Sequence, residues 1–177
     1  FMKNKEDAQK LAEQMIRIGQ LAGREVRCVL TPMDEPLGYS IGNSLEVIEA
    51  INFLKGDMPK DLKEVVLELG ANMLQLAGKG ENIEENKLKI LESIENGNAY
   101  NKFVEMVENQ GGDISFVEDT TKFKKSKYTL AVVTKKTGKV TEINAEDIGK
   151  LACYLGAGRV NKDDKIEPDV GIVLNKK

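Results

Sequence analysis

Two carboxylates beside a turn-forming stretch are the first residues in this sequence that could do chemistry. Glu46 and Glu49 lie three positions apart in a run typical of a helix, directly after the stretch "EPLGYSIGNS" at residues 35–44. Residues at this spacing share one helix face. A carboxylate near a turn rich in main-chain carbonyl groups can bind a hard cation through oxygen ligands. The spacing fits equally well two solvated carboxylates beside a tight turn and a helix cap, so both interpretations stay open.

The composition excludes several other kinds of site. The 177 residues contain no histidine, so they cannot form a His-ligated zinc site or a Ser-His or Cys-His catalytic pair. Cys28 and Cys153 lie far apart among apolar neighbours, which predicts two reduced, buried thiols in a cytoplasmic protein. The net charge of −3 gives no general attraction to nucleic acid or an acidic membrane. No apolar run reaches the roughly 20 residues of a membrane span.

Three further segments carry charge or glycine but predict no site. The basic run at residues 122–139 favours a solvated hairpin edge over a nucleic-acid surface, because the chain as a whole is acidic. The acidic segment at residues 161–169 lacks the glycine and the bidentate glutamate at the offsets of a calcium-binding loop. "LGAGR" at residues 155–159 follows a helix, whereas anions bind at helix N-termini.

The elements that must position these residues are mostly helices. Apolar periodicity, with Asn43, Asp61 and Asn144 as predicted N-caps, indicates helices over residues 7–22, 44–54, 62–76, 84–95, 99–109 and 145–155. Residues 25–31 ("EVRCVLT") read as a buried strand, and residues 128–143 read as a β-hairpin that turns near Gly138. A helix followed promptly by a strand predicts part of an α/β fold, helix-rich with a β-hairpin region near its C-terminus.

Three sequence blocks identify a family resemblance. "PLGYSIGNSLEV" at residues 36–47 matches the pattern "PLG..(V/I)GN(A/S)LEV", residues 155–177 match "LGAGR…D.I…VGI", and "NQGGD" at residues 109–113 fits as well. From end to end, the sequence resembles a pyrimidine-nucleoside phosphorylase of the thymidine phosphorylase family. The resemblance implies cleavage of uridine or thymidine by inorganic phosphate, the co-substrate, to give the free base and a pentose 1-phosphate.

The resemblance also implies an architecture. Family members have a small α domain and a large α/β domain, with the active site in the cleft between them, and the parent protein is expected to be a cytoplasmic homodimer. This sequence resembles part of the large domain: residues 1–112 its helical and strand part, and residues 113–177 its hairpin and C-terminal part. Because the sequence opens on Phe1 and closes on a strand-like run, we expect a domain truncated at both ends.

Few site residues carry over from the family. Its phosphate-binding block "KHSTGGVGD" and the Arg, Ser and Lys that hold the pyrimidine would lie upstream of Phe1, so no catalytic residue is assigned and we expect no phosphorolysis by this stretch alone. Phe1 resembles a family phenylalanine near the pyrimidine pocket. The family resemblance also implies a potassium ion, with ligands at the main-chain oxygens of Leu37 and Ser40 and the side chain of Glu49.

Two other functional classes stay open. The sequence could be a non-catalytic α/β fragment or scaffold domain, which the presence or absence of the phosphate-binding block in the molecule would decide. A relative of the phosphoribosyltransferases with the same architecture is the third class, and activity towards phosphoribosyl pyrophosphate would identify it.

Overall fold

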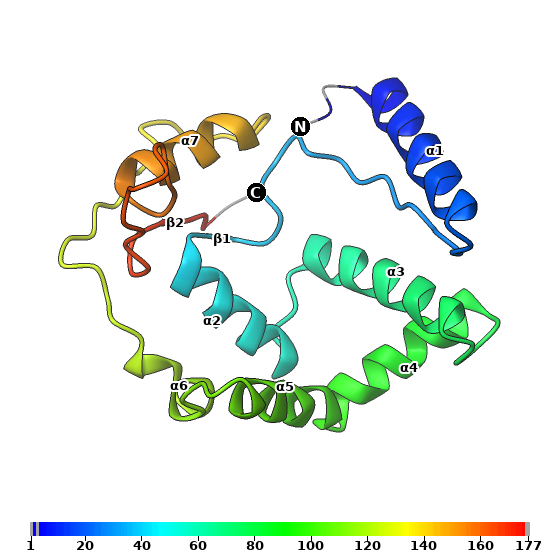
Figure 1. The fold of residues 1–177 in the computed structure, drawn as a ribbon. Coiled ribbons are helices and arrows are strands. Elements are labelled where there is room, and N and C mark those ends of the chain that lie inside the picture. Colours follow the sequence, from blue (N-terminus) through cyan, green and yellow to red (C-terminus); the bar gives the residue numbers. More distant parts are fainter. Residues whose placement is uncertain (1, 3, 176–177) are drawn as a thin grey trace. The chain divides into compact units, whose positions relative to one another are not determined.

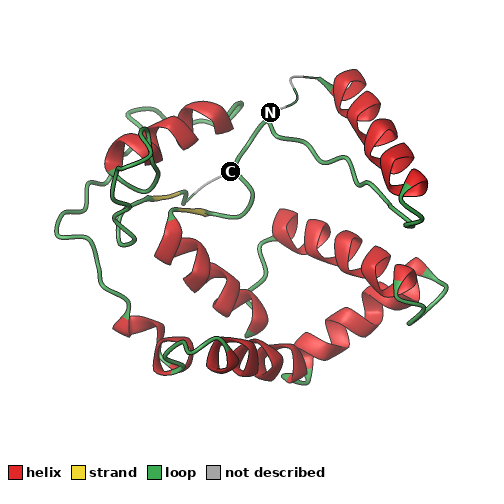
Figure 2. Cartoon of the chain, viewed as in Figure 1, coloured by secondary structure: helices red, strands yellow, loops and turns green. Residues whose placement is uncertain are grey.

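The computed structural model describes residue 2 and residues 4–175. Their helices and one short antiparallel sheet are shown in Figure 1 and Figure 2. In chain order they are α1 (Lys5–Leu21), β1 (Ser40–Ile41), α2 (Asn43–Leu54), α3 (Lys60–Leu76), α4 (Ile83–Glu95), α5 (Asn98–Asn109), α6 (Ser115–Glu118), the 3₁₀ helix η1 (Thr120–Lys122), α7 (Ala145–Leu155) and β2 (Ile172–Val173). The helix-rich α/β class predicted from the sequence is confirmed.

The chain divides into two compact units. The first comprises the residues up to Pro32 with Lys63–Glu92, and the second comprises Met33–Leu62 with the residues from Ser93 onward. Helices α3 and α4 each contribute residues to both units. The predicted division between residues 112 and 113 stays a prediction.

Helix α1 of the first unit begins two residues before the predicted start at residue 7 and ends before Gly23, as predicted. The side chain of Asn4 accepts a hydrogen bond from the Asp7 N–H at 2.8 Å, which satisfies one of the free amides of the first turn. Beyond the last residue, Gly23 takes the left-handed conformation with φ +68°, a common way for a helix to stop.

The strand predicted at residues 25–31 is wrong. These residues form no strand in the described structure and lie instead against α1. A Cβ added at Gly19 would overlap the side chain of Val26, and the Cys28 thiol lies 3.7 Å from the Ala12 carbonyl oxygen. The apolar side chains therefore pack on a helix, and the backbone has no neighbouring strand to pair with.

Helices α3 and α4 are linked in the first unit by a buried amide. Asn86 is 0% exposed and donates from Nδ2 to the carbonyl oxygens of Ala71 at 3.3 Å and Gly80 at 3.2 Å. Near it, Lys87 Nζ lies 2.8 Å from Glu68 Oε2. Their hydrogen bond lowers the pKa of Glu68 and raises the pKa of Lys87, because each charge stabilises the other.

Helix α2 forms the centre of the second unit. Ile51 and Phe53 are buried, and α2 packs against α5 and β1. At its end, Lys55 Nζ donates to the Val117 carbonyl oxygen at 3.3 Å and lies 5.2 Å from the centre of the Tyr100 ring. These contacts fix the C-terminal end of the helix that carries Glu46 and Glu49.

The sheet joins two segments that are far apart in the sequence. Strand β1 pairs antiparallel with β2, so that Ser40 lies opposite Val173 and Ile41 opposite Ile172. Before β2, helix α7 begins at the predicted cap, where Asn144 accepts from the Asp147 N–H at 3.0 Å. The strand-like character of the last residues is therefore confirmed at Ile172–Val173.

The β-hairpin predicted at residues 128–143 is wrong. Within the described chain this stretch contains no strand, and its apolar side chains point into solvent, with Leu130 87% and Val132 90% exposed. A two-stranded hairpin is marginal in water without a third strand or a helix to pack on. The apolar side chains of this segment therefore have no surface to pack on that would stabilise a hairpin.

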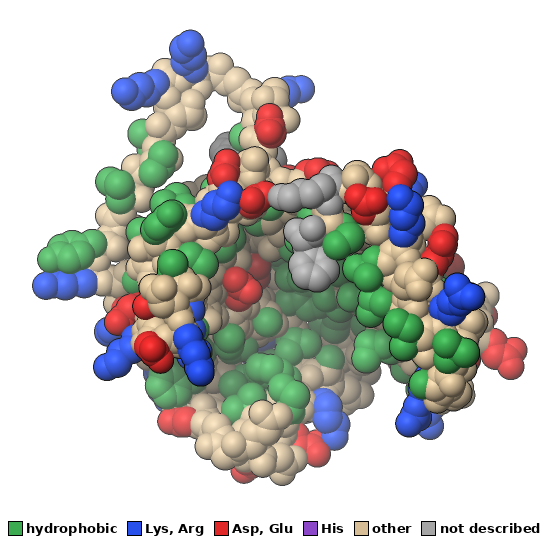
Figure 3. Space-filling model, turned by 45° about the horizontal axis from the view of Figure 1, so that its top comes forward, with side chains coloured by type: hydrophobic (Ala, Val, Ile, Leu, Met, Phe, Trp, Pro, Cys, Tyr) green, Lys and Arg blue, Asp and Glu red, His purple; other side chains and the backbone are tan. Residues whose placement is uncertain are grey.

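The surface mixes apolar and charged groups. In the face shown in Figure 3, hydrophobic side chains lie among acidic and basic ones. Over the part of the chain that the structure describes, no helix is both long enough and apolar enough to cross a membrane.

Candidate functional site

The loop at residues 37–42, called the glycine loop below, requires both of its glycines. Gly38 and Gly42 are buried and have φ values of +70° and +141°, which residues other than glycine rarely adopt. A Cβ at Gly38 would overlap Glu49 Oε2. A Cβ at Gly42 would lie 2.6 Å from the Val170 carbonyl oxygen. Close approach as well as backbone conformation therefore explains the glycines.

Three carboxylates bind the amides of this loop. Glu49 accepts from the N–H groups of Tyr39 at 2.8 Å and of Ser40 at 3.5 Å. Glu46 accepts from the Gly42 N–H at 2.9 Å, and Asp61 accepts from the Gly38 N–H at 3.0 Å. Hydrogen bonds to an ionised acceptor are stronger than neutral ones. The carboxylates of α2 and α3 therefore determine the course of the loop.

The two predicted glutamates thus have a defined role. They were expected either as a solvated pair or as part of a cation site. Both carboxylates accept backbone N–H groups of the glycine loop, with Glu46 exposed and Glu49 half-buried, which agrees with a turn and a helix cap, and the cation site stays a prediction. A carboxylate offers about four lone-pair sites, so the two N–H groups at Glu49 leave acceptor capacity for a cation.

The C-terminal segment meets the same loop. The Leu174 N–H donates to the Tyr39 carbonyl oxygen at 2.8 Å, and the Ser44 N–H donates to the Pro168 carbonyl oxygen at 3.0 Å. Asn43 Nδ2 donates to the Ala157 carbonyl oxygen at 2.8 Å. The blocks at residues 36–47 and 155–177 are therefore brought together at a single place in the fold.

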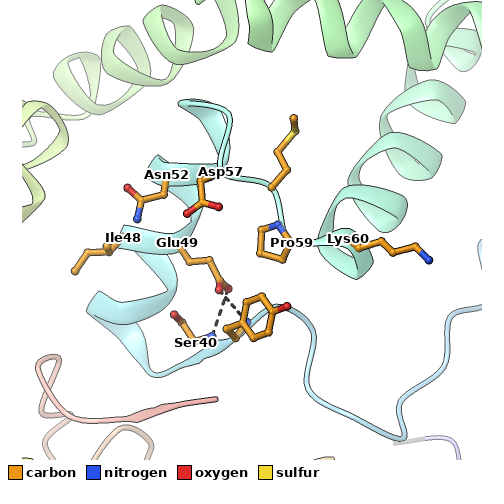
Figure 4. A pocket seen from close by; sticks show the side chains of 9 residues that line it. Ser40, Ile48, Glu49, Asn52, Asp57, Pro59 and Lys60 are labelled. Atoms are coloured by element: carbon orange, nitrogen blue, oxygen red, sulfur yellow. Dashed lines mark hydrogen bonds between the residues drawn. The ribbon is translucent and has the colours of Figure 1, made fainter. Parts of the chain in front are cut away.

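A pocket of about 410 Å³ opens beside the glycine loop, between the loop, α2 and the start of α3. Figure 4 shows Glu49 pointing from α2 towards Ser40, with its hydrogen bonds dashed. Polar and apolar groups share the wall, which consists of Tyr39, Ser40, Ile48, Glu49, Asn52, Asp57, Met58, Pro59 and Lys60. The carboxylates, amide, hydroxyls and ammonium group suit a cation or a polar ligand.

The structure brings some predicted site residues together. Ser40 and Glu49 are in contact, and Leu37 directly precedes Gly38, whose Cα faces the Glu49 carboxylate. Phe1 lies outside the described residues. Among those residues, no three His, Cys, Asp or Glu side chains gather as a metal cluster, so a cation here would need main-chain oxygens as ligands.

Sequence reasoning misplaced two polar residues of the site. Asp61 was predicted to cap a helix starting at residue 62, but α3 begins at Lys60 and the Asp61 carboxylate binds Gly38 instead. Asn43 was predicted as the cap of α2, but Gly42 is the N-cap and Asn43 contacts Ala157. These bonds join residues far apart in the chain, so no local signal could have identified them.

The acidic segment at residues 161–169 has a structural role. Asp164 Oδ2 accepts from the N–H groups of Val160 at 3.0 Å and Asn161 at 2.7 Å. The backbone hydrogen bond from Asn161 is the largest cause that lowers the pKa of Asp164, because it stabilises the ionised form.

The two thiols, Cys28 and Cys153, are free and half-buried.

Comparisons with known proteins match the chain in two places. The model for the glycosyl transferase family, a/b domain, matches residues 1–100. The model for the pyrimidine nucleoside phosphorylase C-terminal domain matches residues 139–177. The first match includes the glycine loop with its three carboxylates, and the second includes α7 and β2.

Curated relatives match over the whole chain. A pyrimidine-nucleoside phosphorylase of Bacillus subtilis (strain 168) is 48% identical over 177 residues. Proteins of the same name from Staphylococcus aureus strains RF122 / ET3-1 and USA300 are 46% identical over 177 residues. The chain spans 41% of the length of each of these relatives.

Proposed function

The chain belongs to the glycosyl transferase family with an a/b domain, and we propose that the complete protein is a pyrimidine-nucleoside phosphorylase. The observation that carries this proposal is the full-chain identity of 46–48% to proteins of that name. The convergence of the blocks at residues 36–47 and 155–177 on the glycine loop supports it. The substrates would be uridine or thymidine with inorganic phosphate.

The proposed reaction is a transfer of the pentose from the base to phosphate. The bond between the sugar C1′ and the pyrimidine N1 breaks, and its electron pair leaves with the base, which takes up a proton. A phosphate oxygen forms the new bond to C1′, which gives a pentose 1-phosphate. Such a reaction gains from holding both substrates in place and excluding water. We assign no catalytic residue within this chain, whose part is to build the glycine loop.

A potassium ion at the glycine loop is part of the proposal. The donor set fits a hard cation, because Leu37 and Ser40 offer main-chain oxygens on the loop that the half-buried Glu49 carboxylate contacts. These three residues would hold the ion. When bound, it would supply positive charge that offsets the carboxylate and ties the loop to the phosphate region. A role for Phe1 near the pyrimidine is proposed on the resemblance alone.

We also propose a cytoplasmic homodimer. The free thiols Cys28 and Cys153 support a reducing compartment. Light scattering of the complete protein after size-exclusion chromatography tests the assembly: twice the mass of one chain is expected, and a monomer would contradict the dimer.

Activity of the complete protein tests the function. Uridine and phosphate should give uracil and ribose 1-phosphate in equal amounts, and omission of phosphate should stop release of the base. A complete protein that releases no base would contradict the proposal and favour a scaffold role. Transfer of the phosphoribosyl group from phosphoribosyl pyrophosphate to a base, with release of pyrophosphate, would favour a phosphoribosyltransferase.

The potassium assignment has a separate test. Glu49→Gln should raise the potassium concentration that gives half-maximal activity, because the variant loses the ligand charge. Glu142→Gln, at an exposed position outside the pocket, is the matched control and should leave that concentration unchanged. Equal potassium dependence in the parent protein and in Glu49→Gln would remove the ion from this loop.

A further inference from the structure

One carboxylate that binds the glycine loop comes from a different element than the others. Glu46 and Glu49 belong to α2, the helix that directly follows the loop, whereas Asp61 belongs to the first turn of α3. Asp61 is half-buried and lies 23 positions along the chain from Gly38, whose buried N–H it accepts at 3.0 Å. Asp61 therefore links the loop to the helix that follows α2.

This bond determines more than the position of one amide. The Gly38 N–H and the Leu37 carbonyl belong to the same planar peptide group, in which they point in opposite directions when the bond is trans. The described chain contains no cis peptide bond. The Asp61 carboxylate therefore sets the direction of the Leu37 carbonyl. The Glu49 carboxylate also lies close to this peptide, because a Cβ added at Gly38 would overlap it.

The next two amides are held in the same way. Glu49 accepts from the N–H groups of Tyr39 and Ser40, and the Tyr39 carbonyl oxygen accepts from Leu174 at 2.8 Å. The peptide before Gly38 is the one whose orientation depends on α3. Loss of the Asp61 acceptor would leave a buried N–H unpaired, and the cheapest relief is rotation of that peptide plane.

We propose that Asp61 is a positioning residue of the glycine loop, which aims the Leu37 carbonyl at the cation site by accepting the Gly38 N–H. This inference rests on the proposed function, because Leu37 is a potassium ligand only within it. A purely structural role is the competing account: an acidic side chain in the first turn of α3 stabilises the helix dipole. The two accounts make opposite predictions for two conservative variants.

Asp61→Asn keeps an acceptor oxygen at the same distance along the side chain but removes the charge. Asp61→Glu keeps the charge at the helix N-terminus but moves the carboxylate by one methylene group. The positioning account expects Asp61→Asn, which still offers an acceptor although a neutral one, to be impaired less than Asp61→Glu. The helix-dipole account expects the reverse. Asp163→Asn, at an exposed position of the second unit, is the control for loss of a charge.

The readout is the potassium-dependent protection of residues 37–42 from hydrogen exchange in the complete protein. It uses potassium chloride titrated at constant ionic strength against sodium chloride and needs no activity. Asp61→Ala and Asp61→Glu should raise the half-saturating potassium concentration about tenfold, the size expected for a lost hydrogen bond to a charged acceptor. Asp61→Asn and Asp163→Asn should stay within about threefold of the parent.

Each outcome decides the proposal. Unchanged potassium binding in Asp61→Glu, or an equal loss in Asp61→Asn and Asp61→Glu, would overturn it even if Asp61→Ala does not fold. Protection of the parent protein that does not depend on potassium would overturn it too, while phosphorolysis by the same sample would leave the proposed enzyme intact. Absence of phosphorolysis would contradict the proposed enzyme, whereas the order of Asp61→Asn and Asp61→Glu in potassium-dependent protection would still decide the role of Asp61.

Discussion

The glycine loop at residues 37–42 and the stretch at residues 128–143 belong to the same compact unit, yet they differ in how they are held. Carboxylates from two helices accept the amides of the loop, and a strand from the C-terminal segment pairs with its last residues. The stretch at residues 128–143 has a clear alternating pattern but no strand within the described chain. Local pattern alone therefore does not decide which segment becomes ordered structure.

The difference lies in the partners that each segment meets. Every polar group that is buried must find a hydrogen bond, and the glycine loop finds side-chain acceptors in α2 and α3 nearby. A strand instead needs the backbone of another strand and a surface for its apolar face. Tyr128, Leu130 and Val132 are at least 80% exposed, so the alternating face has no such surface.

Removal of core volume under the loop should have the largest effect. Ile51 is 0% exposed in α2, and Ile51→Ala should lower the free energy of unfolding by about 2–5 kcal/mol, because a buried side chain leaves a cavity. Val132→Ala, at a 90% exposed position, should change it by less than about 0.5 kcal/mol. Chemical denaturation of both variants measures the free energy of unfolding. Similar decreases in the two variants would contradict the difference between the two regions.

A side chain at Gly38 should have the next largest effect. Gly38→Ala combines a left-handed backbone with overlap at Glu49, and a loss of about 1–3 kcal/mol is expected. Gly56→Ala is the matched control, because Gly56 has φ +101° but nothing lies within 4 Å of the added Cβ. In thermal unfolding, the melting temperature of Gly38→Ala should be lower than that of Gly56→Ala. The opposite order would refute close packing as the reason for glycine at position 38.

Loss of the Glu46 acceptor should have a smaller effect. Glu46→Ala frees the Gly42 N–H that the carboxylate now accepts, and removal of a helix-capping bond costs about 0.5–2 kcal/mol. Glu142→Ala, outside the glycine loop, provides the control. Denaturant titration compares the stability of the two variants. Equal midpoints would mean that water replaces the Glu46 carboxylate without loss of stability.

The smallest predicted effect is a pH dependence at a second loop. The pKa of Asp164 is lowered in the folded chain by its bonds to Asn161 and Val160. This contribution to stability is therefore present above the unfolded pKa, near 3.8, and is lost as pH falls below it through the folded value. Asp164→Asn should flatten the acid limb of a plot of melting temperature against pH. An unchanged limb would exclude Asp164 as a source of the dependence.

Helix positions could be predicted from the sequence because the signals are local. The helices around residues 84–95 and 99–109 begin within one residue of the prediction, and the Asn144 cap forms as expected. The non-strand conformation of residues 25–31 could not be predicted, since an alternating apolar segment fits a helix surface as well as a sheet. The side chains of this segment pack on α1.

The candidate site could be predicted from the sequence only where a residue and its contact lie close together in the chain. The stretch at residues 35–44 indicated a tight turn beside the helix of Glu46 and Glu49, but not that these carboxylates accept the amides of the loop. The contacts of Asp61 with Gly38 and of Asn43 with Ala157 depend on the tertiary fold. Periodicity and cap rules address neighbours within about four residues, so these contacts lay beyond their reach.

The kcat/KM for phosphate in uridine phosphorolysis by the complete protein tests the central claim most directly. The claim is that the glycine loop is an organised part of a phosphorylase site and that residues 128–143 are not. Under conditions in which both variants are folded, Gly38→Ala should lower kcat/KM about a hundredfold, the scale of a small misplacement, and Val132→Ala should leave it unchanged. Equal activity in both variants and the parent protein would contradict the claim.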